Sequence, residues 1–172
     1  MYPCKERESR MTIDAPLCLY RTTVKAEWLD YNGHMNEAYY VLIFSKSTDA
    51  FMDYAGQDAD YRKRTNTSVY TLETHVMYLQ EVSEGEAVRV ETQLLGHDEK
   101  RYRLFHSMYH EGSGDLLATG EHMLVHVDMG GPKSAPFPPE IMDRLAAIRA
   151  AHAGLPVPKQ AGRSIALPGE RG

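Results

Sequence analysis

The spacing of the apolar residues is the feature that most limits how this chain can fold: one segment has the period of a helix, and four later segments have the period of a strand. In residues 36–55, apolar and small side chains recur every three or four positions, which predicts a single amphipathic helix. Four later segments, 68–82, 87–96, 101–111 and 116–127, alternate apolar and polar side chains as half-buried strands do. The turns between them are of hairpin length, so neighbouring strands must run antiparallel.

Another strand is predicted before the helix, at residues 17–27. Asn36 is a suitable N-cap residue for the helix, and Gly56 is a suitable end. After a proline-rich break, residues 140–152 are predicted to form a short amphipathic helix. One long helix and one antiparallel sheet of five or six strands can bury their apolar faces together if the sheet curves around the helix. The predicted fold class is therefore α+β.

The 172 residues suffice for one domain with its own core, which we assign to residues 14–153. Residues 1–13 are expected to form a disordered N-terminal extension, because they are highly charged. Residues 154–172 are expected to form an extended C-terminal tail. The uncovered sheet edges of this arrangement favour self-association.

Composition excludes several classes of function. The formal charge of −5 comes from interspersed acids and bases, without the basic face that a nucleic acid requires. No apolar run is long enough to span a bilayer, and the first residues lack the apolar segment of a secretory signal. Cys4 and Cys18 form no CxxC pair, and the eight histidines show no zinc-type spacing. We expect a cytoplasmic protein with no metal, no other cofactor, and no nucleic-acid or membrane partner.

The segment Trp28–Tyr40, with the sequence WLDYNGHMNEAYY, lies where the first strand ends and the long helix begins. It places Asp30 close to a helix N-terminus, where backbone N–H groups lack intrahelical partners and the helix dipole is positive. Such a position suits a carbonyl oxygen or an anion. We interpret the segment as an active site for attack on an activated carbonyl.

The order of strand, Asp-x-Asn-x-His-x-Asn motif, long helix and four-stranded meander resembles the hot-dog fold of acyl-CoA and acyl-carrier-protein thioesterases, over residues 15–130. It is similar to their 4-hydroxybenzoyl-CoA thioesterase-like branch. The chain resembles still more closely the betainyl-CoA thioesterases of carnitine breakdown, in the segments WLDYNGHMNE, TDAF, ETHV, LLGHDEKR, LLATGEHMLVHVD and GRSIALP. This resemblance implies hydrolysis of a small acyl-CoA, with betainyl-CoA giving glycine betaine and CoA.

The resemblance places the catalytic carboxylate at Asp30, as a general base for water or as a nucleophile. An isolated aspartate in such a turn more often binds its own backbone. The helix and the later motifs favour the catalytic role here. Asn32 and His34 are assigned to the same site, with His34 favoured as a positioning hydrogen-bond partner rather than as the base.

Backbone amides around Gly33, Met35 and Asn36 are candidates for the oxyanion hole, because a glycine lets the backbone approach a ligand. The same residues have a purely structural interpretation. Gly33 is also suited to a turn, and Asn36 is also suited to a helix cap.

Other candidates lie farther along the chain. Glu73 is a second candidate carboxylate, and His75, two residues away on the same strand face, is a candidate substrate contact. An exposed strand face explains this pair equally well. Lys100, Arg101 and Arg103 form a basic turn suited to a phosphate of CoA, although charged turns are more often only solvated.

Aromatic side chains near the motif suit a trimethylammonium group. This cation cannot donate hydrogen bonds, so proteins hold it with aromatic faces and a carboxylate. We assign Trp28, Tyr31 and Tyr39 to substrate binding. Tyr40 and Phe44 fit the core face of the helix.

Two further functions compete with the thioesterase. Enoyl-CoA hydratases of the same fold resemble Asp-x-Asn-x-x-His, whereas one residue separates Asn32 from His34 here. A non-catalytic acyl-CoA-binding module is expected to lack the carboxylate or to include a DNA-binding domain. Another short-chain or aromatic acyl-CoA is the alternative substrate. We expect a homodimer or a dimer of dimers, with the active sites at the subunit interface.

Overall fold

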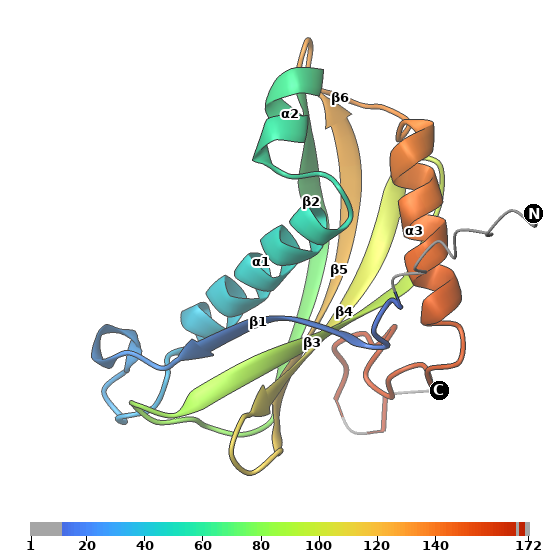
Figure 1. Ribbon diagram of the computed structural model, residues 1–172. Helices are drawn as coiled ribbons and strands as arrows, with labels where there is room; N and C mark the ends of the chain where they lie inside the picture. Colours follow the sequence, from blue (N-terminus) through green and yellow to red (C-terminus); the bar gives the residue numbers. More distant parts are fainter. Residues whose placement is uncertain (1–11, 168, 171–172) are drawn as a thin grey trace, which may run out of the picture.

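The computed structural model describes residues 12–167 and 169–170, so the predicted extension at 1–13 lies almost wholly outside the described residues (Figure 1). The elements in chain order are β1 (Leu17–Thr23), the 3-10 turn η1 (Ala26–Trp28), α1 (Glu37–Tyr54), α2 (Ala59–Thr65), β2 (Thr67–Tyr78), β3 (Ala87–His97), β4 (Arg101–His110), β5 (Leu116–Asp128), β6 (Lys133–Ser134) and α3 (Pro139–Ala151). No helix in the described ranges is long and apolar enough to cross a membrane.

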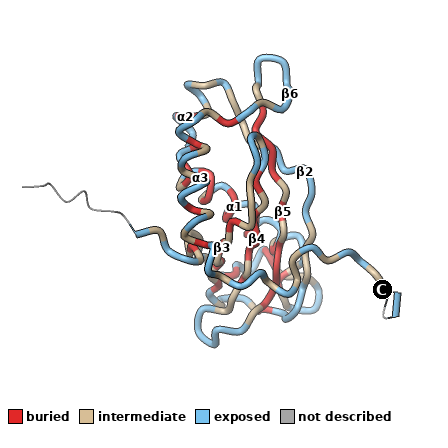
Figure 2. Tube along the Cα trace, turned by 90° about the vertical axis from the view of Figure 1, so that its right-hand side faces the viewer, coloured by how far each residue is buried: buried red, intermediate tan, exposed pale blue. Residues whose placement is uncertain are grey.

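One antiparallel sheet in the order β1-β3-β4-β5-β2 forms the body of the molecule, and β6 pairs with the end of β5. The helices α1 and α3 lie on the same side of this curled sheet (Figure 2). We call that side the inner face and the opposite side the outer face. The prediction of an α+β fold, with one long helix against a curved antiparallel sheet, is confirmed.

Two apolar clusters fill the space between the sheet and the helices. The cluster beneath the first half of α1 includes Tyr40, Ile43, Phe44, Met35 and Val82, which join the helix to the loop before it and to the segment after β2. The cluster beneath the second half of α1 includes Phe51 and Ala55, and it extends to the apolar side of α3 at Ile141, Leu145 and Ile148. Burial of these side chains, at about 25 cal/mol per Å² of apolar surface, holds α1 against the sheet.

The start of α1 follows the sequence prediction closely. The Asn36 Oδ1 atom accepts a hydrogen bond from the backbone N–H of Ala38 at 2.9 Å, as an N-cap residue does. At the other end, Gly56 has a φ of +87°, which favours glycine. Residues of one side of α1 are buried, whereas Val41 and Leu42 on the other side are 40% exposed.

Three local predictions were wrong. The strand predicted at 17–27 ends at Thr23, because the chain turns into η1 before the motif. The strand predicted at 68–82 ends at Tyr78, where the chain leaves the sheet. No helix was expected between residues 57 and 67, yet α2 lies there, and its N-cap Asp58 accepts the Tyr61 N–H at 2.8 Å; the charged composition of this segment gave no apolar repeat to indicate a helix.

The described part of the predicted tail lies against the outer face of the sheet. The backbone N–H of Gly162 donates to Glu121 Oε2 at 2.6 Å, and Arg163 contacts the sulfur of Met77 at 3.6 Å. Gln93 of β3 donates to the carbonyl of Pro156 at 3.4 Å. These contacts hold the described part of the tail against β2, β3 and β5, although it contains no helix or strand.

Two histidines are buried beneath α1, with their ring centroids 5.0 Å apart. The two ring nitrogens of His106 contact the hydroxyls of Thr48 and Thr92 at 3.0 and 2.9 Å. The Nδ1 atom of His122 contacts the Thr74 hydroxyl at 3.1 Å. Burial lowers the pKa of His122 to about 4 and that of His106 well below its usual value. Both rings are therefore neutral in the folded protein at neutral pH.

The buried histidines predict a loss of stability in acid. Their pKa values are depressed in the folded state, so the unfolded chain takes up protons first as the pH falls below about 6.5. For His122, a fall in pKa from 6.5 to about 4 corresponds to about 3 kcal/mol of unfolding free energy. This stability is complete above pH 6.5 and is lost as the pH falls towards 4. Urea unfolding at fixed protein concentration, at several pH values, measures it.

The matched comparison is between His122→Gln and His75→Gln. The first should flatten the dependence of unfolding free energy on pH, because a glutamine cannot be protonated in this range. The second replaces a histidine on the outer face, outside the buried pair, and is the control for the loss of an imidazole. Equal slopes for the wild type and His122→Gln would contradict the assignment.

Candidate active site

The loop between η1 and α1 is held as a tight turn. The backbone carbonyl of Asp30 accepts the N–H of Gly33 at 3.0 Å, and the N–H of Asp30 donates to the carbonyl of His34 at 2.9 Å. Gly33 has a φ of +79°, a conformation that other residues adopt only with strain. The loop is joined to the segment after β2 by the N–H of Met35, which donates to the carbonyl of Val82 at 2.9 Å. Its position is thus fixed from both sides.

The side chain of Asp30 has two different oxygens. Its Oδ1 atom accepts the backbone N–H of Asn32 at 2.7 Å, the geometry of an aspartate that closes its own turn. The Oδ2 atom has no hydrogen-bond partner among the described residues. The structural and the catalytic interpretations of Asp30 are therefore compatible, because the turn uses only one oxygen.

Asp30 and His34 both line a surface cavity of about 410 Å³ at the N-terminal end of α1. The wall of this cavity comes from three parts of the chain: the motif loop, the first turns of α1, and the end of β2 with the residues that follow it. The lining residues are Asp30, His34, Met35, Glu37, Tyr40, Tyr78, Leu79, Gln80 and Glu81.

Negative charge dominates this cavity. Asp30, Glu37 and Glu81 contribute three carboxylates, and none of the described lining residues is a lysine or an arginine. The two tyrosines meet edge to face, with the ring centroids of Tyr40 and Tyr78 5.4 Å apart. Burial and then the charge of Glu81 raise the pKa of Tyr40 to about 12. The three carboxylates, with no basic side chain among the described lining residues, describe a site that favours a cation over an anion.

Several backbone amides near the cavity already have acceptors. Gly33 donates to Asp30, Met35 donates to Val82, and Asn36 donates to the carbonyl of Trp28. Within the described residues, the N–H of Glu37 has no acceptor, and it belongs to the first residue of α1. A ligand oxygen at the helix N-terminus would meet this amide first.

The aromatic residues assigned from sequence lie elsewhere. Trp28 is only 8% exposed, stacks on Tyr39 at 5.4 Å, and has the Lys25 ammonium 5.4 Å from its ring centroid. Tyr31 is 97% exposed and points away from the packed structure. Neither these three aromatic residues nor Asn32 lines the cavity in the single chain.

The residues that sequence reasoning missed come mainly from the end of β2 and the segment that follows it. Tyr78, Gln80 and Glu81 lie more than forty positions from the motif, and nothing in the local pattern links them to it. Tyr40 was expected in the core; its ring is buried and it also reaches the cavity. Glu37, in the first turn of α1, also lines the cavity and was assigned no role from the sequence.

Glu73 and His75 share a strand face, as expected, and that face is the outer one. They pair with Met123 and Glu121 of β5, which alternate with the inward-facing His122. They line a second cavity of about 430 Å³ together with Arg103 and Glu121. The structure does not bring them together with Asp30 in one chain.

Two of the three basic side chains in the predicted phosphate-binding turn already form ion pairs. Arg101 binds Asp98 at 2.7 Å, and Arg103 pairs with Glu121 across the sheet. Lys100 and Arg101 line a further cavity of about 400 Å³ on the outer face, with Tyr70 and Lys133. Arg103 is not part of that lining.

Comparisons with known proteins agree with this architecture. The profile of the thioesterase-like superfamily matches residues 24–145. The chain is 50% identical to the betainyl-CoA thioesterase of Pseudomonas aeruginosa, over 88% of this chain and 96% of that protein. It is 43% identical to the L-carnitine dehydrogenase/betainyl-CoA thioesterase of Agrobacterium fabrum, over 92% of this chain and 32% of that longer protein.

Two solved structures resemble the whole described fold. A proposed thioesterase from Pseudomonas putida superposes with a TM-score of 0.79 at 46% identity, over 90% of this chain and 99% of the other. A hypothetical protein from Staphylococcus aureus, solved in complex with CoA, superposes with a TM-score of 0.82 at 28% identity, over 91% and 99% of the two chains.

Proposed function

The chain belongs to the thioesterase-like superfamily and is an acyl-CoA thioesterase, and we propose that it hydrolyses betainyl-CoA to glycine betaine and CoA. The acyl group of this substrate is small and has a permanent positive charge. The relative from Pseudomonas aeruginosa is named for this substrate, and the identity of 50% extends over nearly the whole of that protein.

The observation that most supports this substrate is the composition of the cavity wall. Three carboxylates and the rings of Tyr40 and Tyr78 surround the space beside Asp30. A trimethylammonium group gains from aromatic faces, by about 0.5–2 kcal/mol each, and from nearby carboxylates. An anionic acyl group would be repelled by the same wall. We assign cation binding to Tyr78 and Glu81, which line the same cavity as Asp30 and His34.

We assign the chemical step to Asp30. Its Oδ2 atom takes a proton from water as the water oxygen bonds to the thioester carbonyl carbon. The tetrahedral intermediate then breaks its C–S bond and releases the CoA thiolate, which is a good leaving group and requires no strong acid. Direct attack by Oδ2, to form an anhydride that water later opens, is the other course.

These two courses differ in the source of one oxygen atom. In a single turnover in ¹⁸O-labelled water, general-base catalysis gives labelled glycine betaine. An anhydride opened at the aspartyl carbonyl instead leaves the label on Asp30 and gives unlabelled product in the first turnover. Label on the peptide that contains Asp30, detected by mass spectrometry, therefore identifies the anhydride opened at the aspartyl carbonyl.

The oxyanion that forms on the carbonyl is assigned to the N-terminus of α1. The N–H of Glu37 has no acceptor among the described residues, and the helix dipole adds positive potential there. One correctly placed donor of this kind is worth about 3–4 kcal/mol in a transition state. His34, on the same wall, is assigned to positioning the thioester.

The nucleotide part of CoA is assigned to the basic outer surface. Lys100 and Lys133 have no ion-pair partner among the described residues, and Arg101 lies beside them in the same cavity. Arg103 is less suited to a phosphate, because Glu121 already neutralises it.

A homodimer formed through β2 is the proposed assembly. The outer edge of β2 has no partner strand in the described part of the chain. Exposed apolar residues gather along this edge and on the adjacent side of α1: Val41, Leu42, Tyr70, Leu72, Tyr78 and Leu79. Edge-to-edge pairing would cover this surface and extend the sheet. A second copy would then lie next to the cavity, since Tyr78 and Leu79 belong to both.

The dimer predicts the effect of one surface charge. Leu72→Asp should weaken self-association at least tenfold, because it places a carboxylate in the covered apolar edge. Val157→Asp changes an exposed apolar residue of the tail and should have no effect. Sedimentation equilibrium of the three proteins measures this, and a monomeric wild type at micromolar concentration would refute the assembly.

The function itself is tested by CoA release from a panel of thioesters. Betainyl-CoA, acetyl-CoA, a medium-chain acyl-CoA and an aromatic acyl-CoA should be compared at equal concentration, with crotonyl-CoA hydration measured in parallel. We expect betainyl-CoA to have the highest kcat/KM and crotonyl-CoA to be left unhydrated. Equal rates for all thioesters would refute the substrate but not the reaction.

A further inference from the structure

A hydrogen-bonded turn after β2 supports the loop that contains Asp30. Val82 accepts the N–H of Met35 at 2.9 Å, and His34 and Ser83 face each other as an isolated bridge. These contacts attach the second half of the loop, next to α1, to residues 82–83. Any movement of this turn is therefore transmitted to the loop.

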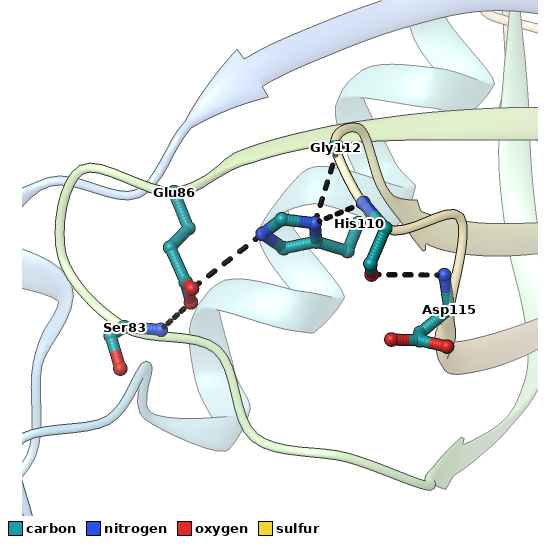
Figure 3. Close-up of polar contacts among 6 residues, drawn as sticks. Ser83, Glu86, His110, Gly112 and Asp115 are labelled. Atoms are coloured by element: carbon teal, nitrogen blue, oxygen red, sulfur yellow. Dashed lines mark hydrogen bonds and ion pairs between the residues drawn. The ribbon is translucent and has the colours of Figure 1, made fainter.

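Glu86 holds that turn in place. Its Oε2 atom accepts the backbone N–H of Ser83 at 2.6 Å (Figure 3), and its own N–H donates to the carbonyl of Ser83 at 3.3 Å. The bond from the Ser83 N–H to the Glu86 carboxylate is the one that a glutamate makes in a capping box, whereas the second bond goes to the backbone carbonyl of Ser83 and not to its hydroxyl. A hydrogen bond of this length to a charged acceptor is among the stronger kinds in proteins. The carbonyl of Glu86 also accepts the N–H of Val24 at 2.9 Å, which ties the turn to the chain after β1.

His110 holds Glu86 from the other side. The Nδ1 atom of His110 accepts the backbone N–H groups of Gly112 and Ser113 at 3.2 and 3.0 Å, so its proton lies on Nε2. The Nε2 atom faces Glu86 Oε1 at 3.5 Å, a distance for electrostatic attraction rather than a close hydrogen bond (Figure 3). The carboxylate thus lies between a fixed N–H of the turn and a fixed N–H of the imidazole at the end of β4.

We propose that Glu86 and His110 are positioning residues for the thioesterase site, which fix the loop of Asp30 through Ser83, Val82 and Met35. The inference rests on the proposed role of Asp30 in the reaction. Neither residue lines the cavity of Asp30, so neither touches the substrate in the single chain. Their effect is on the geometry of the loop, where a displacement of about 1 Å can cost a hundredfold in rate.

Kinetics of Glu86→Ala test the role in catalysis. We expect kcat to fall about ten- to hundredfold and KM to change less than about threefold. The pH dependence of kcat should keep its shape, because the proposed base, Asp30, is still present. Glu86→Gln should recover most of the rate, since its amide oxygen can still accept the Ser83 N–H. Glu84→Ala is the matched control, because it removes an exposed carboxylate of the same turn, and its kcat and KM should equal those of the wild type. A Glu86→Ala enzyme with control kinetics, or with an altered pH profile, would overturn the proposal.

Amide hydrogen exchange tests the positioning without any substrate. In Glu86→Ala, the N–H groups of Ser83, Met35 and Asp30 should exchange at least tenfold faster than in Glu84→Ala, while amides of β4 keep their rates. His110→Ala should increase the same rates by a smaller factor and should add little to Glu86→Ala in the double variant. Unchanged exchange at Met35 and Asp30 would refute the positioning role. An inactive wild type with the expected exchange pattern would instead refute the proposed function and leave the contact pathway intact.

Discussion

Replacement of Asp30 by asparagine should lower kcat for thioester hydrolysis by about a thousandfold, with the fold unchanged. The asparagine Oδ1 atom can still accept the N–H of Asn32, so the turn keeps its bond of 2.7 Å. The variant loses the second carboxylate oxygen, which has no other partner among the described residues and faces the proposed reaction. Steady-state kinetics with betainyl-CoA, together with circular dichroism and thermal unfolding, measure the two effects separately.

Glu73→Gln is the matched control for this variant. It removes one negative charge from an exposed carboxylate of β2, on the outer face of the sheet. Its kcat should stay within about twofold of the wild type. A near-normal rate for Asp30→Asn with a large loss for Glu73→Gln would transfer the catalytic role to Glu73, which requires that a second subunit brings it to the cavity.

Removal of the positive charge from the substrate should lower kcat/KM by about thirtyfold. In 3,3-dimethylbutyryl-CoA a carbon replaces the nitrogen of betainyl-CoA, so the shape is almost the same. The loss of attraction to Tyr78, Glu81 and Glu37 is worth about 2 kcal/mol, and each 1.4 kcal/mol is a factor of ten. Parallel kcat/KM measurements on the two thioesters give this ratio directly.

Two variants assign the preference to the cavity wall. Glu81→Gln and Tyr78→Leu should each reduce the ratio between the cationic and the neutral thioester by several-fold. Glu84→Gln and Tyr78→Phe are the controls, since Glu84 lies outside the lining and phenylalanine keeps the aromatic face. A wild-type ratio near one would show that charge does not select the substrate and would leave only a general thioesterase.

The sequence predicted the fold well because its signals are local. The apolar repeat of α1, its Asn36 cap and the alternating strands β3 to β5 each depend on neighbouring residues, and all are found at nearly the expected positions. The ends of β1 and β2 were misplaced, since a strand ends where its hydrogen-bonding neighbour ends. That information lies in distant segments.

The candidate site was predicted only in part, for the same reason. Asp30 could be identified because it lies within a motif at the start of a helix. Glu81 and Tyr78 reach the site through the path of β2, which no local pattern specifies. Trp28 was assigned to substrate binding because of its proximity in sequence, whereas Tyr39 and Lys25 cover its ring faces in the fold.

The division of the core beneath α1 has a consequence for inherited variation. The cluster around Leu145 and Ile148 lies beneath the second half of α1, at the other end of the helix from the cavity. A mutation there that destabilises the fold should lower the amount of folded enzyme in a cell, while each surviving molecule keeps its normal turnover. A mutation at Met35 or Val82, in the cluster beneath the Asp30 loop, should instead alter turnover per molecule. Two variants with equal unfolding free energies can therefore differ in whether a larger gene dosage restores growth.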